Sequence, residues 1–198
     1  IACGLNGWWK GSEAMKAIVD ADPKLIVADQ KRFDRISREP THPVLIFEEM
    51  DIANQSEMID SFIRLDEDEC ACLLYTSGTT GAPKGVMTSH RSMIANSTLS
   101  MLQGAAVSQD SSSKGIDWAK HKPTSLLTSP LFHVSGLSAG VVTSLFAGST
   151  TLLYAGKFSA HKILELIDKF NVTSWGGAVP TALKRVLDAA NETNISLP

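Results

Sequence analysis

The stretch "LLYTSGTTGAPKGVMTSH", residues 73–90, joins two apolar runs through a polar loop. Its ten residues 76–85 contain three glycines, four hydroxyl side chains and one lysine. The flanking runs "ACLLYTS" (71–77) and "GVMTSH" (85–90) have the composition of strands, and the few residues between them leave no room for a helix. We therefore predict a β-hairpin with an enlarged, glycine-rich loop.

The residue types in this loop suit an anionic ligand. Glycine accepts positive φ and has no Cβ, so we expect backbone N–H groups at Gly78, Gly81 and Gly85 to converge on an anion. The hydroxyls add donors, and Lys84 adds a mobile positive charge. The loop is not the P-loop of nucleoside triphosphatases, because Pro83 precedes the lysine and a glycine follows it. A hairpin tip with incidental threonines is the alternative, but the lysine and both strands favour a phosphate cradle.

On both sides of this hairpin, short apolar runs alternate with segments whose apolar residues recur with the period of an α-helix. The predicted strands are residues 24–29, 43–49, 71–77, 85–90, 125–130, 150–155 and 172–179. The predicted helices are residues 11–20, 52–63, 90–104, 135–147, 159–170 and 180–192. Gly148 suits the end of one helix and Ser159 the N-cap of the next. This alternation predicts an α/β fold, with largely parallel sheets flanked by helices and the hairpin as the exception.

Composition and charge exclude several classes of protein. Apolar residues make up 43% and charged residues 20% of the 198, and the net charge is −3 without a basic cluster. Neither nucleic acid nor an anionic membrane is therefore expected as a partner. The span 123–156 has no charged residue, but a proline, a histidine and several glycines interrupt it, so we expect a buried strand–helix–strand rather than a transmembrane segment. The three cysteines form no CxxC pair, which is typical of reduced thiols in a cytoplasmic protein.

The loop and its surroundings resemble a known family. "YTSGTTGAPKGV" (75–86) is similar to the AMP-binding signature of the adenylate-forming superfamily, which includes acyl-CoA synthetases, luciferases and the adenylation domains of peptide synthetases. Three further segments resemble the same family: "LNGWWKGSEAMKAIVDADPKLIVADQKR" (5–32), "PLFHVSGL" (130–137) and "VTSWGGAVPTALKRVLD" (172–188). Within the superfamily, the acyl-CoA synthetases, such as long-chain fatty acid–CoA ligases, are the expected relatives.

The resemblance implies a two-step reaction. A carboxylate attacks the α-phosphate of ATP–Mg²⁺ to give acyl-AMP and pyrophosphate, and a thiol, usually of coenzyme A, then displaces AMP. Fixed N–H, hydroxyl and ammonium donors would stabilise the charge on the departing pyrophosphate. The resemblance assigns Thr80 as a magnesium ligand and Lys84 as catalytic. The residues that it implies for phosphate binding are Thr76, Ser77, Gly78, Thr79, Thr80, Gly81 and Lys84.

His133 is the second residue to which the resemblance gives a catalytic role. On its own, a histidine in an apolar stretch is more often a satisfied core residue. In the family, a histidine or aromatic at this position orients the carboxylate and the α-phosphate. "FHVSG" contains no aspartate to pair with a substrate ammonium, and an unpaired buried ammonium is costly, so an acid without an amino group is favoured. The expected acyl-site residues are His133, Val134, Gly136, Trp175 and Gly177, with Leu137 and Val179 as further candidates.

Other family segments do not occur in these 198 residues: Tyr-Gly-x-Thr-Glu for adenine and magnesium, Thr-Gly-Asp for ribose, and the catalytic lysine of the C-terminal domain. We therefore expect a single fragment of the AMP-binding N-terminal domain, with an upstream α/β segment (1–69), a phosphate-loop and acyl-site segment (70–198) and a surface loop (107–124). Losing three ligand hydrogen bonds of about 1.5 kcal/mol each weakens ATP binding by about three powers of ten. The isolated piece is expected to be inactive and to need the remainder of its chain.

Three functions stay open at this point. The first is a carboxylic acid–CoA ligase that acts on a fatty acid and uses ATP, Mg²⁺ and coenzyme A. The second is an aryl- or amino-acid adenylation domain that loads a carrier protein. The third is a phosphate- or partner-binding module without chemistry. A substrate panel on the complete protein separates the first two, and the reading frame beyond Pro198 tests the third.

Overall fold

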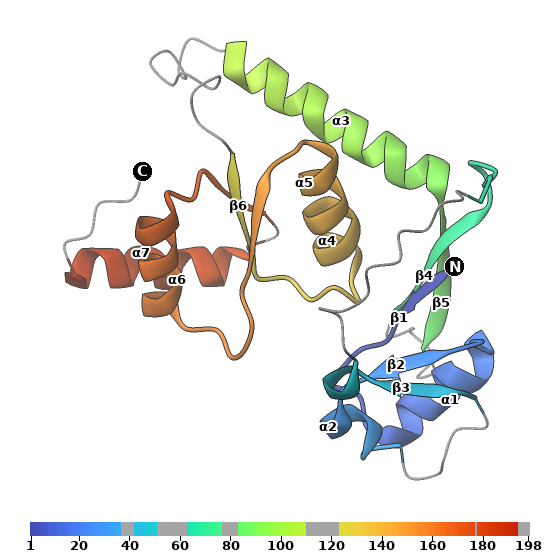
Figure 1. Ribbon diagram of the computed structural model, residues 1–198. Helices are drawn as coiled ribbons and strands as arrows, with labels where there is room; N and C mark the ends of the chain where they lie inside the picture. Colours follow the sequence, from blue (N-terminus) through green and yellow to red (C-terminus); the bar gives the residue numbers. More distant parts are fainter. Residues whose placement is uncertain (37–41, 51–62, 77–82, 110–122, 177, 194–198) are drawn as a thin grey trace. The chain divides into compact units, whose positions relative to one another are not determined.

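The computed structural model describes residues 1–36, 42–50, 63–76, 83–109, 123–176 and 178–193 (Figure 1). The chain divides into two compact units, residues 1–90 and 91–198. Each unit contains both helices and strands, and four of the five strand pairings among the described residues are parallel. The predicted α/β class with largely parallel sheets is confirmed.

The first unit contains two small sheets. In one, β4 (Cys70–Thr76) lies between β1 (Ala2–Gly4), which is parallel to it, and β5 (Lys84–Ser89), which is antiparallel. In the other, β2 (Ile26–Ala28) pairs in parallel with β3 (Val44–Ile46). The helical segments are α1 (Gly11–Ala21), α2 (Gln30–Phe33) and a 3-10 turn (Phe47–Glu49). The predicted hairpin is therefore present, as the pair β4–β5.

Helix α1 begins and ends with recognisable capping. At its start the Glu13 carboxylate accepts a hydrogen bond from the backbone N–H of Lys10 at 2.8 Å. At its end Asp22 adopts the left-handed conformation, with φ of 41°. Between them Ala17 and Ile18 are buried, at 2% exposure each. The helix thus presents one apolar stripe to the unit's interior.

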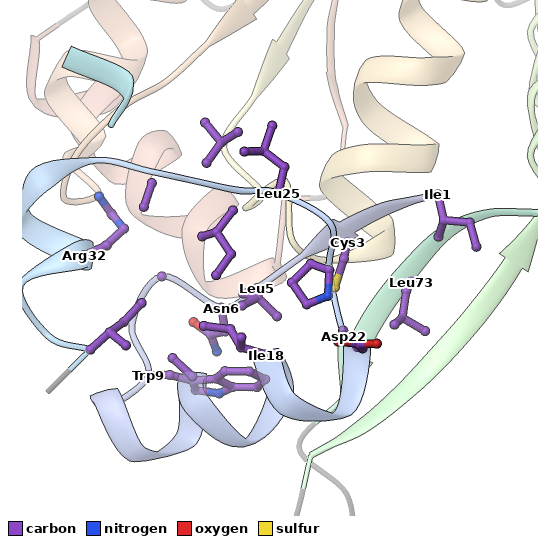
Figure 2. Close-up of a pocket in the computed structure, with 18 of the residues that line it drawn as sticks. Ile1, Cys3, Leu5, Asn6, Trp9, Ile18, Asp22, Leu25, Arg32 and Leu73 are labelled. Atoms are coloured by element: carbon purple, nitrogen blue, oxygen red, sulfur yellow. The ribbon is translucent and has the colours of Figure 1, made fainter. Parts of the chain in front are cut away.

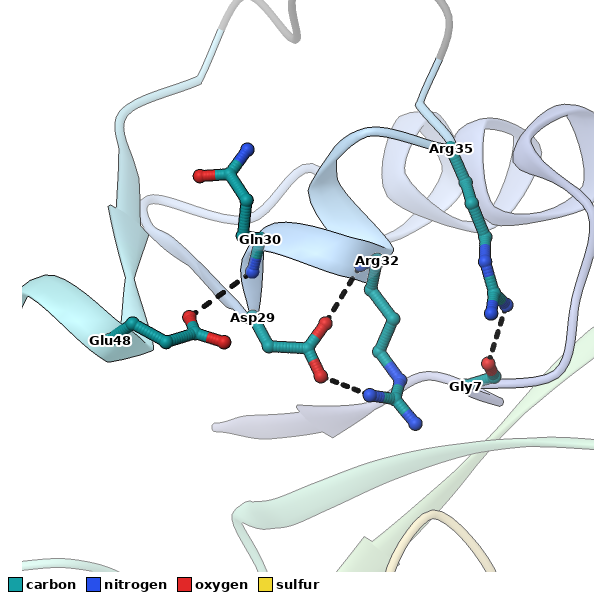
Figure 3. Close-up of polar contacts among 6 residues, drawn as sticks. All are labelled: Gly7, Asp29, Gln30, Arg32, Arg35 and Glu48. Carbon is teal, nitrogen blue, oxygen red and sulfur yellow. Dashed lines mark hydrogen bonds and ion pairs between the residues drawn. The ribbon is translucent and has the colours of Figure 1, made fainter.

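A polar network holds the short helix α2 in place (Figure 3). Asp29 is its N-cap, and its carboxylate accepts from the backbone N–H of Arg32 at 2.7 Å and pairs with the Arg32 guanidinium. The backbone N–H of Gln30 donates to Glu48 at 3.1 Å, and Arg35 donates to the carbonyl of Gly7 at 2.9 Å. These contacts link the loop before α1, helix α2 and the 3-10 turn after β3.

The second unit is built on a parallel sheet. Strand β6 (Thr124–Leu127) lies between β7 (Thr150–Leu153) and β8 (Ser174–Gly176). The long helix α3 (His90–Gln109) begins at the last residue of the first unit. The remaining helices are α4 (Val134–Gly136), a π-helical segment (Leu137–Val142), α5 (Thr143–Phe146), α6 (Ala160–Phe170) and α7 (Pro180–Thr193).

Two consecutive leucines of β6 pack against two different groups of helices. Leu126 is fully buried in a cluster with residues of α6 and α7, among them Ile163 and Val186. The side chain of Leu127 lies against Gly140 of the π-helical segment, since a Cβ at that glycine would stand 2.6 Å from Leu127 Cδ1. Successive side chains of a strand point to opposite faces. The central strand is therefore covered on both faces, as Figure 1 shows for α6–α7 and α4–α5.

The uncharged span 123–156 forms β6, the α4–α5 helical stretch and β7, as predicted. Along the described part of the chain, no helix is both long and apolar enough to cross a membrane. Gly148 ends the α5 stretch with φ of 66°, and the Ser159 side chain caps α6, so both capping predictions are confirmed.

Several boundaries differ from the sequence prediction. Residues 47–49 form a 3-10 turn instead of continuing the strand, and β1 and α2 had not been predicted. Helix α3 includes residues 107–109 of the predicted surface loop. Most of that loop (110–122) and nearly all of the predicted helix 52–63 lie outside the described residues.

Candidate functional site

The β4–β5 hairpin brings the two ends of the glycine-rich stretch together. Thr76 and Lys84 are the last register pair, and the Thr76 hydroxyl donates to the Lys84 carbonyl at 3.5 Å. Both residues are exposed, and Lys84 makes no ion pair with any residue that the structure describes. The remaining residues of the predicted phosphate site lie outside the described ranges: Ser77, Gly78, Thr79, Thr80 and Gly81. Thr76 and Lys84 therefore define the described part of this site.

Gly85 has a different role from the one expected. It lies within β5 opposite Tyr75, and it is not among the described glycines with positive φ. A Cβ at this position would stand 2.9 Å from Leu73 Cδ1 and 3.3 Å from Tyr75 Cζ. The positive φ expected at Gly85 is therefore not found, and the glycine leaves room for the side chains of Leu73 and Tyr75 that pack over it.

Tyr75, directly before Thr76, connects the hairpin to helix α1. Its ring is buried and meets Trp9 edge-on, with ring centroids 6.0 Å apart. Its hydroxyl donates to Asp20 Oδ2 at 2.6 Å and lies 3.2 Å from the carbonyl of Ala17. Burial raises the pKa of Tyr75, and the hydrogen bond to Asp20 raises it further, so the phenol keeps its proton as a donor.

Tyr75 was not among the site residues predicted from the sequence. The available signal was a hydroxyl-bearing ring inside an otherwise apolar strand, because a buried tyrosine hydroxyl nearly always finds a hydrogen-bond partner. The partner, Asp20, is 55 residues earlier in the chain, so it could not be named from spacing.

His133 caps the helical stretch that follows β6. Its backbone is extended, and its Nδ1 accepts a hydrogen bond from the backbone N–H of Ser135 at 3.2 Å. The Ser135 hydroxyl lies 2.8 Å from the same nitrogen. Since Nδ1 is an acceptor, the neutral ring carries its proton on Nε2. The exposed imidazole therefore presents an N–H donor on the side away from the helix.

Two other predicted acyl-site residues lie close to His133. Val134 is next in sequence and 52% exposed. Gly136 is buried, and a Cβ there would lie 2.1 Å from the carbonyl oxygen of Pro130. The glycine thus lets the start of the helix sit directly against the turn that follows β6. This geometry favours a packing role for Gly136 and leaves Val134 accessible.

The structure places Trp175 with the core of the second unit. It pairs in register with Leu126 and packs against the same cluster. Its indole N–H donates to Thr128 Oγ1 at 3.0 Å, just beyond the end of β6. Packing in this core therefore explains the position of the Trp175 ring. Gly177 lies outside the described residues. Of the further candidates, Leu137 is half-buried and Val179 is 59% exposed.

A cavity of about 790 Å³ lies within the first unit (Figure 2). Its walls come from β1, helix α1 and the chain around β2, with apolar side chains such as Trp9, Ile18 and Leu25. Leu73 and Met87 of the hairpin also line it, but Thr76 and Lys84 do not. The cavity therefore touches the hairpin, but neither Thr76 nor Lys84, the described residues of the predicted phosphate site, lines it.

Comparison with solved structures defines the class of protein. The chain is similar to O-succinylbenzoate coenzyme A synthetase from Bacillus subtilis in complex with AMP, at 29% identity and a TM-score of 0.69 over 95% of this chain and 45% of that one. The same synthetase in complex with ATP and magnesium ion gives 28% identity and a TM-score of 0.67 over 94% of this chain and 36% of that one. The fold is that of the N-terminal domain of adenylate-forming enzymes.

The chain belongs to the AMP-binding enzyme family, which matches residues 1–196. Among curated relatives, it is 31% identical to peroxisomal OPC-8:0-CoA ligase 1 of Arabidopsis thaliana over 91% of this chain. It is 34% identical to oxalate–CoA ligase of the same plant over 70% of this chain. The chain spans 33% and 25% of the length of these two proteins. Homologues of this chain are thus CoA ligases.

Proposed function

We propose that the complete protein containing this chain is an ATP-dependent carboxylic acid–CoA ligase that works through an acyl-adenylate. Family membership supports the ligase class. The observation that carries the proposal is the position of Lys84, exposed at the end of the hairpin and opposite Thr76. A cation there, within the AMP-binding signature, suits the charge that develops on a pyrophosphate leaving group.

In the proposed reaction the carboxylate oxygen bonds to the α-phosphorus of ATP as the bond to pyrophosphate breaks. Lys84 and the Thr76 hydroxyl would bind the phosphates, together with Ser77, Gly78, Thr79, Thr80 and Gly81 of the signature. Magnesium, with Thr80 as a proposed ligand, would neutralise phosphate charge. Coenzyme A thiolate would then attack the acyl carbon and release AMP.

His133 is proposed to orient the carboxylate against the α-phosphate. Its Nε2–H is available for this purpose because Ser135 occupies Nδ1. A donor held in one orientation at a helix N-terminus can bind an oxygen that carries negative charge without reorganising. Val134, which is 52% exposed beside it, is proposed to contact the acyl chain.

For the substrate we propose an acid without an amino group, with a fatty acid as the first choice. Support comes from the segment around His133, which offers no carboxylate to pair with an ammonium. The names of the two relatives above refer to quite different acids, OPC-8:0 and oxalate, so a panel of a fatty acid, an aryl acid such as 4-coumarate, oxalate and an amino acid decides the class. Activity with the amino acid alone, followed by transfer to a carrier-protein thiol, would favour the adenylation-domain alternative.

We also propose the cytoplasm as the location, on the basis of three free thiols in the described structure: Cys3, Cys70 and Cys72. One relative is named as peroxisomal, which is the competing compartment. Fractionation of cells that express the complete tagged protein distinguishes the two.

The central test is Lys84→Ala in the complete protein, measured by ATP–pyrophosphate exchange. Removing one preorganised donor to a developing anion typically costs about 100-fold or more in rate. Lys16→Ala is the control, because Lys16 is also exposed in the first unit but lies on helix α1. Equal rates for the Lys84 and Lys16 variants would remove Lys84 from its proposed role. A wild-type protein that binds ATP but shows no exchange with any acid would favour the non-catalytic module.

A further inference from the structure

The hydroxyl of Tyr75 ties the end of β4 to helix α1. It donates at 2.6 Å to the Asp20 carboxylate, a hydrogen bond of the charge-assisted kind. The carbonyl of Ala17, at 3.2 Å and one turn earlier in the helix, is a second acceptor. Tyr75 itself is 8% exposed, so its hydroxyl is fixed in a partly buried setting. The strand thus cannot shift along the helix without breaking these bonds.

The aromatic ring of Tyr75 makes further contacts, one of them with the opposite strand of the hairpin. It meets Trp9 on one side and lies over Gly85 on the other strand. The pair Tyr75–Gly85 directly precedes the pair Thr76–Lys84 in the register. Whatever fixes the ring therefore also fixes the backbone from which the Thr76 hydroxyl and the Lys84 ammonium extend.

We infer that Tyr75 is a positioning residue for ATP, anchoring the phosphate-binding hairpin on helix α1 through its hydroxyl bond to Asp20. The inference rests on the proposed function, since it assigns Tyr75 to nucleotide binding. Preorganised donors gain their effect from being held in place before the ligand arrives. A hairpin freed from α1 would have to be ordered by ATP itself, at the expense of affinity.

The test uses the complete protein with Tyr75→Phe, assayed by ATP–pyrophosphate exchange. We expect the KM for ATP to rise about tenfold, as for loss of a hydrogen bond to a charged group, while the KM for the acid changes less than about twofold. Loss of folded protein would lower the apparent kcat and leave both KM values unchanged. This split separates positioning from a general effect on stability.

Asp20 provides a matched pair of variants. Asp20→Ala removes the acceptor and should raise the KM for ATP as much as Tyr75→Phe does. Asp20→Asn keeps an acceptor oxygen without the charge and should restore part of the loss. The double variant Tyr75→Phe/Asp20→Ala should be no worse than either single variant, because both remove one interaction. Additive losses would contradict the inference.

Tyr154→Phe is the control, because Tyr154 is the other tyrosine of the chain and its hydroxyl donates to the Lys157 carbonyl at 2.7 Å in the second unit. It should leave the KM for ATP unchanged. An unchanged KM in the Tyr75 variant as well would overturn the inference and leave the proposed function standing. If the wild type shows no exchange with any acid, the proposed function fails instead.

A second measurement, which does not depend on catalysis, tests the inference independently. Amide hydrogen exchange at Lys84 should be about tenfold faster in Tyr75→Phe than in wild type. The reason is that the variant lacks the hydrogen bond from Tyr75 to Asp20, which holds this end of the hairpin on helix α1. The exchange rate should not change in Tyr154→Phe. Equal exchange rates in wild type and Tyr75→Phe would overturn the anchoring itself.

Discussion

Tyr75 and Gly85 lie opposite each other in the β4–β5 hairpin, and the Tyr75 ring occupies the space that a side chain on residue 85 would need. The Tyr75 Cζ would be 3.3 Å from a Cβ at that position, and Leu73 Cδ1 would be 2.9 Å away. A glycine inside a strand is usually unfavourable, so its presence here indicates a packing requirement. Packing of the Leu73 and Tyr75 side chains, and not backbone flexibility, thus explains the last glycine of the signature.

Gly85→Ala should therefore destabilise the first unit by about 1–2 kcal/mol, the usual cost of adding a methyl group to a filled site. The measurement is the free energy of unfolding in urea. Gly104→Ala is the control: nothing lies within 4 Å of a Cβ at that position in helix α3, so the variant should be up to about 1 kcal/mol more stable. If Gly85→Ala also gains stability, the ring does not fill the space described.

Gly136→Ala should have a larger effect, about 3 kcal/mol, because the added methyl would meet the backbone carbonyl of Pro130, which cannot rotate away. Urea unfolding of the second unit measures it. Gly176→Ala should change the same quantity by less than about 0.5 kcal/mol, since nothing lies within 4 Å of a Cβ there. If Gly136→Ala leaves the free energy of unfolding unchanged, packing does not explain this glycine. The acyl-contact role predicted from the sequence would then be favoured.

Acid stability should depend on Asp29. Partial burial acts to raise the pKa of Asp29, but hydrogen bonds from the backbone and guanidinium of Arg32, with the charge of Arg35, outweigh it and lower the pKa overall. A lowered carboxyl pKa stabilises the fold above its unfolded value near pH 4, and that contribution is lost as pH falls through the lowered pKa. NMR titration of the Asp29 carboxyl carbon should give a midpoint below the ordinary range.

Asp29→Asn separates charge from capping, because asparagine caps helices about as well as aspartate. The variant should be less stable than wild type at neutral pH, and the difference should shrink as the pH falls below about 4 and passes through the lowered pKa of Asp29, because the wild-type carboxylate is then protonated. A difference that is independent of pH would show that the ion pair with Arg32 contributes nothing.

The hairpin, the parallel pairings and the family could be predicted because they depend on local patterns. Apolar runs flank the loop, helical period separates the strands, and the signature is contiguous in sequence. Ser159 and Gly148 were predictable for the same reason, since a cap or a stop depends on one residue and its neighbours.

What could not be predicted depends on pairs distant in sequence. The strand β1 is only Ala2–Gly4, and it is defined by pairing with Cys72–Leu74 rather than by its own composition. The bond from Tyr75 to Asp20 joins a strand to a helix that precedes it by 55 residues. The reason for Gly136 is a carbonyl of the preceding turn. A single sequence does not show which residues that lie far apart along the chain come into contact in the fold.

His133 provides the sharpest test of the proposed chemistry. Its Nδ1 is occupied by the backbone N–H of Ser135, so only Nε2–H is available to a substrate oxygen. In His133→Gln the side-chain amide places an N–H near the position of Nε2, whereas the shorter side chain of His133→Asn does not reach that position and can place only its amide oxygen near Nδ1. ATP–pyrophosphate exchange by the complete protein should fall about tenfold in the Gln variant and about 100-fold or more in the Asn variant. The Asn variant can still cap the helix, so its expected stability is close to that of wild type. The reverse order of activities would mean that Nδ1 is the functional nitrogen, and equal rates in both variants and wild type would remove His133 from the reaction.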